Sequence, residues 1–194
     1  MRKGERTKQA ILDHAMQLSS EVGLEALSIG GLAKRAGLSK SGLYAHFDTK
    51  ETLQCEVLDN AAARWLDVVL TPALKAPRGV PRLEALFEQW IAWERDELDG
   101  GCPFIAAGTE FDDRPGPVRD CLKGHLRDML GAVGRAAEIA VEEGHLRADL
   151  DTDQLAFELW GALLAYHHYR RLLDADDAGA RARRALASMI AAAA

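Results

Sequence analysis

The sequence predicts an all-α protein, and three features of its 194 residues lead to this prediction. Apolar residues make up 48% of the chain but aromatic residues only 6%, so Ala and Leu, both strong helix formers, dominate the apolar content. Apolar residues recur at helical spacing in almost every segment. Runs of β-branched residues are nearly absent. Helices are therefore expected from end to end, in a small unit followed by a larger one.

The first helix is expected from about residue 5 to residue 22. Its apolar side chains fall three or four residues apart and form one stripe: Ile11, Ala15, Leu18 and Val22. Gly23 is the expected stop. A second helix follows, with Ser28 as its N-cap and Gly37 at its end.

Two further helices are expected directly after this turn. Ser39 is a suitable N-cap for the third helix, over residues 39–47. Asp48 is predicted to cap the fourth helix, with Glu51 three residues later completing a capping box. The fourth helix is expected over residues 48–70, because its apolar residues recur at four-residue steps.

Residues 70–81 are the clearest break in the chain, because they hold three prolines. Beyond the break, apolar periodicity predicts five helices, over residues 82–98, 104–112, 117–143, 152–173 and 177–191. Gly144 is the expected end of the long helix 117–143, and Asp151 or Thr152 is the expected cap of the next one.

Several classes of protein are disfavoured. There is no H-E-x-x-H motif, no paired C-x-x-C motif and no phosphate-cradling glycine loop, so no enzyme, metal site or cofactor is predicted. No apolar run approaches the roughly 18 residues that span a membrane. Three cysteines, an odd number, and the lack of a signal sequence favour a reducing, cytoplasmic location.

The charge of the chain is uneven. Residues 1–50 hold eight Lys or Arg and five Asp or Glu, whereas the whole chain holds 24 basic and 30 acidic residues. This difference suggests that the N-terminal unit meets an anion, although ordinary variation of surface charge gives the same balance.

The N-terminal helices match a helix-turn-helix unit. Ala33 is small enough for close packing, and Gly37 suits the turn. If residues 39–47 form the recognition helix, the first turn of this helix faces the major groove of DNA. The predicted DNA contacts are Ser28, Ser39, Lys40, Ser41, Gly42, Tyr44, His46 and Lys50. Other readings stay open: Ser39 as a cap, Tyr44 as a packing residue, and His46 as ordinary surface.

This region resembles the DNA-binding region of the TetR family of transcriptional regulators. The residues that match the pattern of this family are Ser28, Leu32, Ala33, Ala36, Gly37, Leu38, Ser39, Ser41, Leu43, Tyr44, His46, Phe47, Thr49, Lys50, Glu51 and Leu53. Gly30 and Gly31 depart from it, because the family has better helix formers there.

The resemblance implies about nine helices in two domains. Residues 1–47 are the expected DNA-binding domain. Residues 48–194 are the expected ligand-binding and dimerisation domain, with helix 48–70 as connector. The last two helices are expected to form the interface of a homodimer, because a monomer would leave their apolar faces exposed. The predicted interface residues are Leu155, Leu159, Leu163, Tyr166, Ala182, Leu186 and Met189. Intramolecular packing of both helices is the alternative.

An effector pocket is expected among the fourth to eighth helices. The candidate lining residues are Trp65, Trp90, Trp93, Cys102, Phe104, Phe111, His125, Met129, Trp160 and His167. Large side chains at helical spacing also fit an ordinary core. Cys102, near a helix N-terminus, is either a reactive thiol or a packing residue.

Together these features predict a ligand-responsive dimeric repressor that binds an inverted-repeat operator in double-stranded DNA and is released by a small apolar or aromatic effector. An activator of the same family and an architectural DNA-binding protein without a ligand are the alternatives.

Overall fold

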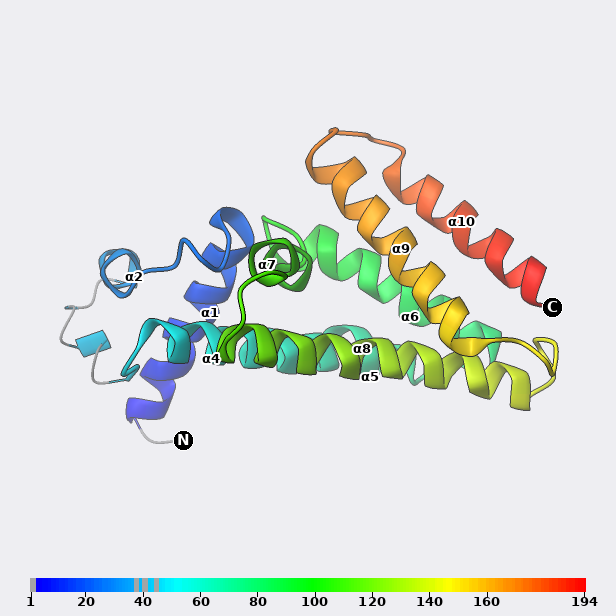
Figure 1. Ribbon diagram of the computed structural model, residues 1–194, viewed down its shortest axis with the longest axis horizontal. Helices are drawn as coiled ribbons and strands as arrows, with labels where there is room; N and C mark the ends of the chain where they lie inside the picture. Colours follow the sequence, from blue (N-terminus) through cyan, green and yellow to red (C-terminus); the bar gives the residue numbers. More distant parts are fainter. Residues whose placement is uncertain (1–2, 37–38, 40–41, 44–45) are drawn as a thin grey trace. The chain divides into compact units, whose positions relative to one another are not determined.

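The computed structural model describes residues 3–36, 39, 42–43 and 46–194, and these residues form helices and connecting turns with no strand (Figure 1). The helices are α1 (Lys3–Val22), α2 (Ile29–Ala36), α4 (Lys50–Trp65), α5 (Thr71–Ala73), α6 (Val80–Ala92), α7 (Pro103–Phe111), α8 (Pro117–Glu142), α9 (Thr152–Arg171) and α10 (Ala178–Ala193). Two π-helical segments, η1 (Leu66–Leu70) and η2 (Trp93–Glu97), extend α4 and α6. The all-α prediction is confirmed for this part of the chain.

Two compact units make up the chain, and each is built from two separate segments. The first unit contains residues 1–64 and 98–125, and the second unit contains residues 65–97 and 126–194. The expected boundary at residue 47 separates a DNA-binding domain from a ligand-binding domain by function, not by packing. This boundary stays a prediction.

A row of polar contacts joins α1 to α4 in the first unit. Lys8 Nζ lies 2.5 Å from Glu56 Oε2. Gln9 donates a hydrogen bond of 2.7 Å to the side-chain oxygen of Asn60, whose amide donates to Asp13 Oδ1 at 3.1 Å. Exposed ion pairs contribute only about 0–1 kcal/mol each, so the row acts mainly on the alignment of the two helices.

The predicted apolar stripe of α1 is only partly buried. Ile11 and Ala15 are buried as expected, but Val22 is 50% exposed. The inner side of the last turn belongs to Ser20, whose Oγ accepts the N–H of Gly100 at 3.1 Å. Val22 follows Ser20 by two residues, about 200° around the helix, and therefore points away from this contact.

Three local signals in the N-terminal region act as predicted. Gly23 ends α1 with a φ of +88°, a conformation that favours glycine. Ser28 Oγ accepts the N–H of Gly31 at 3.0 Å, and Ser39 Oγ accepts the N–H of Gly42 at 3.0 Å. Both serines thus have the geometry of N-caps.

The predicted cap of the fourth helix is wrong by one residue. α4 begins at Lys50, and Thr49 rather than Asp48 is the cap, because Thr49 Oγ1 accepts the N–H of Thr52 at 3.0 Å. This start places Thr52, not Glu51, at the third helical position, so the expected capping box is absent.

The fourth helix also extends beyond its predicted end at residue 70. In η1 the N–H of Thr71 bonds to the carbonyl of Leu66, five residues earlier. Pro72 lies in the first turn of α5, where a residue without a backbone N–H is tolerated. Helical structure therefore continues to Ala73 before the chain turns.

The helices of the second unit agree with their predicted positions within a few residues. Gly144, with a φ of +71°, follows α8, and Asp151 Oδ1 caps α9 by accepting the N–H of Gln154 at 2.9 Å. α9 and α10 pack side by side (Figure 1). α10 also contacts α6. None of the described helices has the length and apolar character needed to cross a membrane.

Gly100 in the first unit lies directly against the backbone of α1. A Cβ on Gly100 would collide with the backbone carbonyl of Ser20. We expect Gly100→Ala to lower the free energy of unfolding by about 1–3 kcal/mol, because the backbone at residue 100 or at Ser20 has to move to make room for the methyl group. Gly108→Ala is the matched control. A Cβ there meets no atom within 4 Å, so helix propensity should raise stability by up to about 1 kcal/mol.

Urea unfolding of both variants at one protein concentration measures this difference. Equal stability of the two variants would contradict the close approach of residue 100 to α1.

Candidate functional site

The described part of the predicted DNA-binding unit has a small, fully buried core. Leu32, Leu43 and Phe47 expose none of their surface, and the Lys8 ammonium lies 5.3 Å from the centre of the Phe47 ring. Buried apolar side chains on both sides of the predicted turn are what a helix-turn-helix unit requires.

The predicted DNA contacts fall into two groups. Ser28 and Ser39 are exposed, and Gly42, His46 and Lys50 are partly exposed, so each has surface available to a ligand. The remaining three predicted contacts lie outside the described residues: Lys40, Ser41 and Tyr44.

Lys50 has a structural partner that the sequence did not reveal. Its ammonium donates a 2.6 Å hydrogen bond to the Glu25 carbonyl and lies 3.2 Å from the Glu25 carboxylate. Gln54, one turn later and buried, donates to the Leu24 carbonyl at 2.9 Å. These bonds attach the start of α4 to the loop between α1 and α2. The Lys50 hydrogen bond lowers the pKa of the Glu25 carboxyl, and Gln54 and Arg114 act in the same direction.

Four of the predicted effector residues lie in the first unit. Cys102, Phe104 and Phe111 are buried. His125 is half-buried: its ring packs edge-on against Phe104 with centroids 6.0 Å apart, and its Nε2 lies 2.8 Å from Asp59 Oδ1. The burial of Cys102 favours its packing role over a reactive thiol.

The other six lie in the second unit, where three indole rings form a continuous cluster. The ring centroids of Trp65 and Trp90 are 5.0 Å apart, and those of Trp90 and Trp160 are 5.7 Å apart. Trp93 and Met129 are buried as well. An apolar cavity beside Trp90 and Trp160 has a volume of about 10 Å³, room for about one water molecule.

The sixth, His167, is bonded to a buried acid that sequence reasoning missed. Glu94 is 1% exposed, and its Oε2 lies 2.9 Å from His167 Nδ1. Burial raises the pKa of the Glu94 carboxyl, and His167 offsets part of this rise. Arg170 donates to the Glu94 carbonyl at 2.9 Å and so holds the π-helical segment η2 against α9. Helical spacing could have indicated that Glu94 is buried, since Glu94 follows the buried Trp90 by four residues and therefore lies on the same face of the helix.

Buried polar atoms without a protein partner accompany this pair. Within the described residues they include Glu94 Oε1 and the indole nitrogens of Trp65, Trp90 and Trp93. A buried carboxylate oxygen without a hydrogen bond is costly. This part of the second unit therefore offers one acceptor and several donors to a small molecule or to water.

The predicted dimer interface is mostly inside the single chain. Six of its seven residues are buried there, namely Leu155, Leu159, Leu163, Tyr166, Ala182 and Leu186, and Met189 is half-buried. The expectation that a monomer exposes them is wrong, because the single chain already buries them: α9 packs beside α10, and Leu159 and Leu163 line an apolar cavity together with residues of α6 and α8.

A different apolar stripe of α9 faces solvent. Phe157 is 70% exposed and Leu172 is 73% exposed, and Gly161 and Ala165 are exposed between them. Phe157, Gly161 and Ala165 recur every four residues, so they share one face of α9, and Leu172 follows at the C-terminal end of the helix. Helical spacing alone did not tell which of the two apolar stripes of α9 would face inward.

Two family models match the chain. Residues 79–186, more than half of its length, match the family described as "Tetracyclin repressor-like, C-terminal domain", and residues 11–57 match "Bacterial regulatory proteins, tetR family". The second match contains α1 from residue 11 onward, all of α2 and the capped start of α4.

Known proteins agree with this match. The HTH-type transcriptional regulator AcrR of Shigella flexneri is 38% identical over 165 residues, which cover 82% of this chain and 75% of AcrR. A TetR transcriptional regulator from Chloroflexus aurantiacus has a similar solved structure, with a TM-score of 0.86, 22% identity, and coverage of 98% of this chain and 96% of that one. The structure of AibR in complex with isovaleryl coenzyme A and operator DNA has a TM-score of 0.72 at 21% identity, covering 93% of this chain and 96% of AibR.

These matches agree with the helix-turn-helix core, the caps of Ser28 and Ser39, and the all-helical fold. The chain therefore belongs to the TetR family of DNA-binding transcriptional regulators, which are not enzymes.

Proposed function

We propose that this protein is a repressor that binds an inverted-repeat operator as a homodimer and leaves it when a small effector binds the second unit. The observation that carries the proposal is the match of residues 11–57 to the tetR DNA-binding region, together with the buried core that Leu32, Leu43 and Phe47 give it. The fold relative AibR binds both operator DNA and an acyl coenzyme A, which supports two ligands on one such chain.

The exposed stripe of α9 supports the homodimer. Phe157, Gly161 and Ala165 combine one large anchor with two small residues, which allow close approach of a second helix. A surface groove of about 220 Å³ lies beside it, lined by alanines of α9 and α10 and by Tyr166 and Tyr169. A two-fold pair of chains buries this surface and presents two DNA-binding units to an operator with two half-sites.

The second unit supports an effector that is largely apolar and carries one hydrogen-bond donor or positive charge. Trp65, Trp90 and Trp160 supply aromatic surface. Glu94 Oε1 supplies the unpaired acceptor. A small number of polar groups in a mostly apolar lining is typical of ligand sites.

Release of DNA follows from thermodynamic linkage between effector binding and operator binding. Since the cavity beside Trp90 holds about 10 Å³, an effector larger than water has to separate helices of the second unit. Binding then favours a conformer with a wider cavity, and it weakens operator binding to the extent that this conformer fits DNA less well.

The direct test selects bound fragments from genomic and randomised DNA with the purified protein, and measures its mass in solution. Enrichment of an inverted repeat bound by a dimer is the expected result. Weak, salt-sensitive binding with no enriched sequence would contradict the proposal.

Lys50 tests the DNA surface. If Lys50 contacts a phosphate in each subunit, Lys50→Ala should weaken operator binding and reduce the slope of log affinity against log salt by about 2 per dimer, from about 0.9 per contact. Lys75→Ala, an exposed lysine of the second unit, is the matched control and should leave the slope unchanged.

Glu25 separates this role from a purely structural one. Glu25→Gln removes the carboxylate beside Lys50 and should strengthen operator binding, because a negative charge near the phosphates is lost. Equal weakening by Lys50→Ala and Glu25→Gln, measured by fluorescence anisotropy, would mean that the pair only supports the fold.

Phe157 tests the dimer. Phe157→Arg places a charge in the proposed interface and should weaken dimerisation by at least about 2 kcal/mol in sedimentation velocity. Leu74→Arg is the control, because Leu74 is also exposed, at 52%, but lies outside α9 and α10. Dimers of unchanged affinity in the Phe157 variant would place the interface elsewhere.

Glu94 tests the buried acid through pH. Its raised folded-state pKa means that its contribution to stability is fully present below about pH 4.3, the usual pKa of an unfolded Glu, and is lost as the pH rises through the folded-state pKa. Glu94→Gln removes this loss, so the variant should gain stability relative to the native protein as the pH rises above about 4.3. The test is to measure the urea-unfolding midpoints of the native protein and of Glu94→Gln as a function of pH. Parallel curves for the two proteins would refute the raised pKa of the Glu94 carboxyl.

A further inference from the structure

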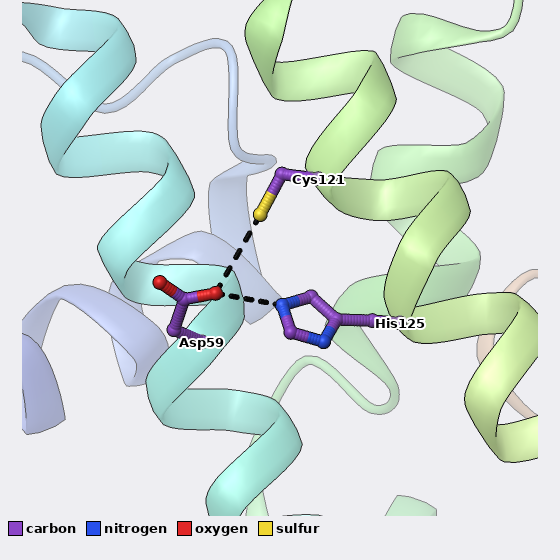
Figure 2. A group of neighbouring side chains, drawn as sticks. All are labelled: Asp59, Cys121 and His125. Atoms are coloured by element: carbon purple, nitrogen blue, oxygen red, sulfur yellow. Dashed lines mark hydrogen bonds and ion pairs between the residues drawn. The ribbon is translucent and has the colours of Figure 1, made fainter.

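Three metal-ligating side chains converge in the first unit, on the facing sides of two helices. Asp59 belongs to α4, and Cys121 and His125 belong to α8 (Figure 2). Asp59 Oδ1 lies 2.8 Å from His125 Nε2 and 3.6 Å from Cys121 Sγ. One potential ligand atom from each residue lies within 4.8 Å of the other two.

Helix geometry explains why these side chains meet. Cys121 and His125 are four residues apart and therefore share one face of α8. Asp59 shares its face of α4 with Cys55, again four residues away. Cys121 Sγ lies 3.8 Å from the Cys55 carbonyl, and each of the two thiols affects the pKa of the other. Two pairs spaced for a common ligand thus face one another.

The donor set selects a class of ion. Sulfur, imidazole nitrogen and a carboxylate oxygen together suit Zn²⁺ and similar divalent transition metals, whereas Mg²⁺ and Ca²⁺ prefer oxygen alone. In a tetrahedral zinc site, bond lengths of about 2.0–2.3 Å place ligand atoms about 3.3–3.8 Å apart. For Asp59, Cys121 and His125, side-chain rotations that shorten the longest separation between ligand atoms by about 1 Å are enough to reach this geometry.

Access also suits a reversible site. Asp59 is exposed, and Cys55, Cys121 and His125 are half-buried. An ion can therefore reach the ligands from solvent, and the surrounding protein shields the sulfurs in part. A simple Asp–His ion pair explains the 2.8 Å contact but not the arrival of two thiols at the same place.

We propose that Asp59, Cys121 and His125, with Cys55 as the fourth ligand, bind a divalent transition-metal ion of the zinc class. The bound ion links α4, the helix that follows the DNA-binding residues, directly to the N-terminal half of α8.

Cobalt provides the test, because Co²⁺ takes the place of Zn²⁺ and reports its ligands by absorption. The full-length protein, reduced and stripped of metal, is titrated with Co²⁺. Sulfur-to-cobalt charge-transfer absorption and intense visible bands of a tetrahedral site are expected, and Zn²⁺ should abolish both. A spectrum without charge-transfer absorption would overturn the proposal on the native protein alone.

Variants assign the ligands. Cys121→Ala should remove part of the charge-transfer absorption and lower the affinity for Zn²⁺, measured against a competing chelator, by at least about 100-fold. Cys55→Ala should remove the remaining part, and an unchanged spectrum would eliminate Cys55 as a ligand. Cys102→Ala is the matched control, since Cys102 is the cysteine outside the cluster, and it should keep the native spectrum.

His125→Asn completes the assignment, with His14→Asn on the exposed side of α1 as its control. Circular dichroism without metal confirms that each variant is folded. Native affinity for Zn²⁺ in folded Cys121→Ala or His125→Asn would overturn the site. All of these measurements are made without DNA, so they stand apart from the proposed repressor function.

Discussion

The attachment of α4 to α1 and to the loop after it is the constraint on which the first unit depends. Gln54 is 2% exposed and holds the Leu24 carbonyl, and Lys50 holds the next carbonyl at residue 25. A buried carbonyl without a donor would cost about 1–3 kcal/mol, so these bonds fix where α4 begins. From this start, the polar row to α1 and the apolar positions of α4 follow in register.

This attachment gives α4 two tasks at once. Its first turn supports the loop that presents α2, and its middle carries Asp59 toward α8. A displacement of α4 therefore changes the support of the DNA-binding residues and the geometry of the metal-ligating cluster together. Coupling of this kind needs no long chain of contacts, because one rigid helix is common to both places.

Local features were the ones that the sequence predicted well. Gly23, Gly144, Ser28, Ser39 and Asp151 act through bonds to residues a few positions away, and their signals survive in any tertiary context. The prediction of Asp48 as the cap of α4 was wrong because its neighbour Thr49 can also cap a helix, and it is Thr49 Oγ1 that accepts the N–H of Thr52.

Features that join distant segments could not be read in the same way. Glu94 meets His167 across 73 residues, and Asp59 meets Cys121 and His125 across 62 and 66 residues. The two apolar stripes of α9 have the same helical period, so only the packing of α9 in the second unit shows which of them is buried. Lys50 was predicted as a DNA contact. Its bond to Glu25 could not be predicted, because it depends on how the chain between these two residues folds.

The division of both units into separate segments has a consequence for synthesis. The chain leaves the first unit after residue 64, returns to it at residue 98 and leaves again after residue 125. When residues 1–64 have emerged from the ribosome, Gly100 and α7, which pack against α1, are still to come. At about 5–20 residues per second, the first unit waits several seconds for its missing part. A fragment that ends after α4 would therefore lack contacts that the complete first unit has. The isolated DNA-binding region should accordingly be less stable than the same residues in the full-length chain.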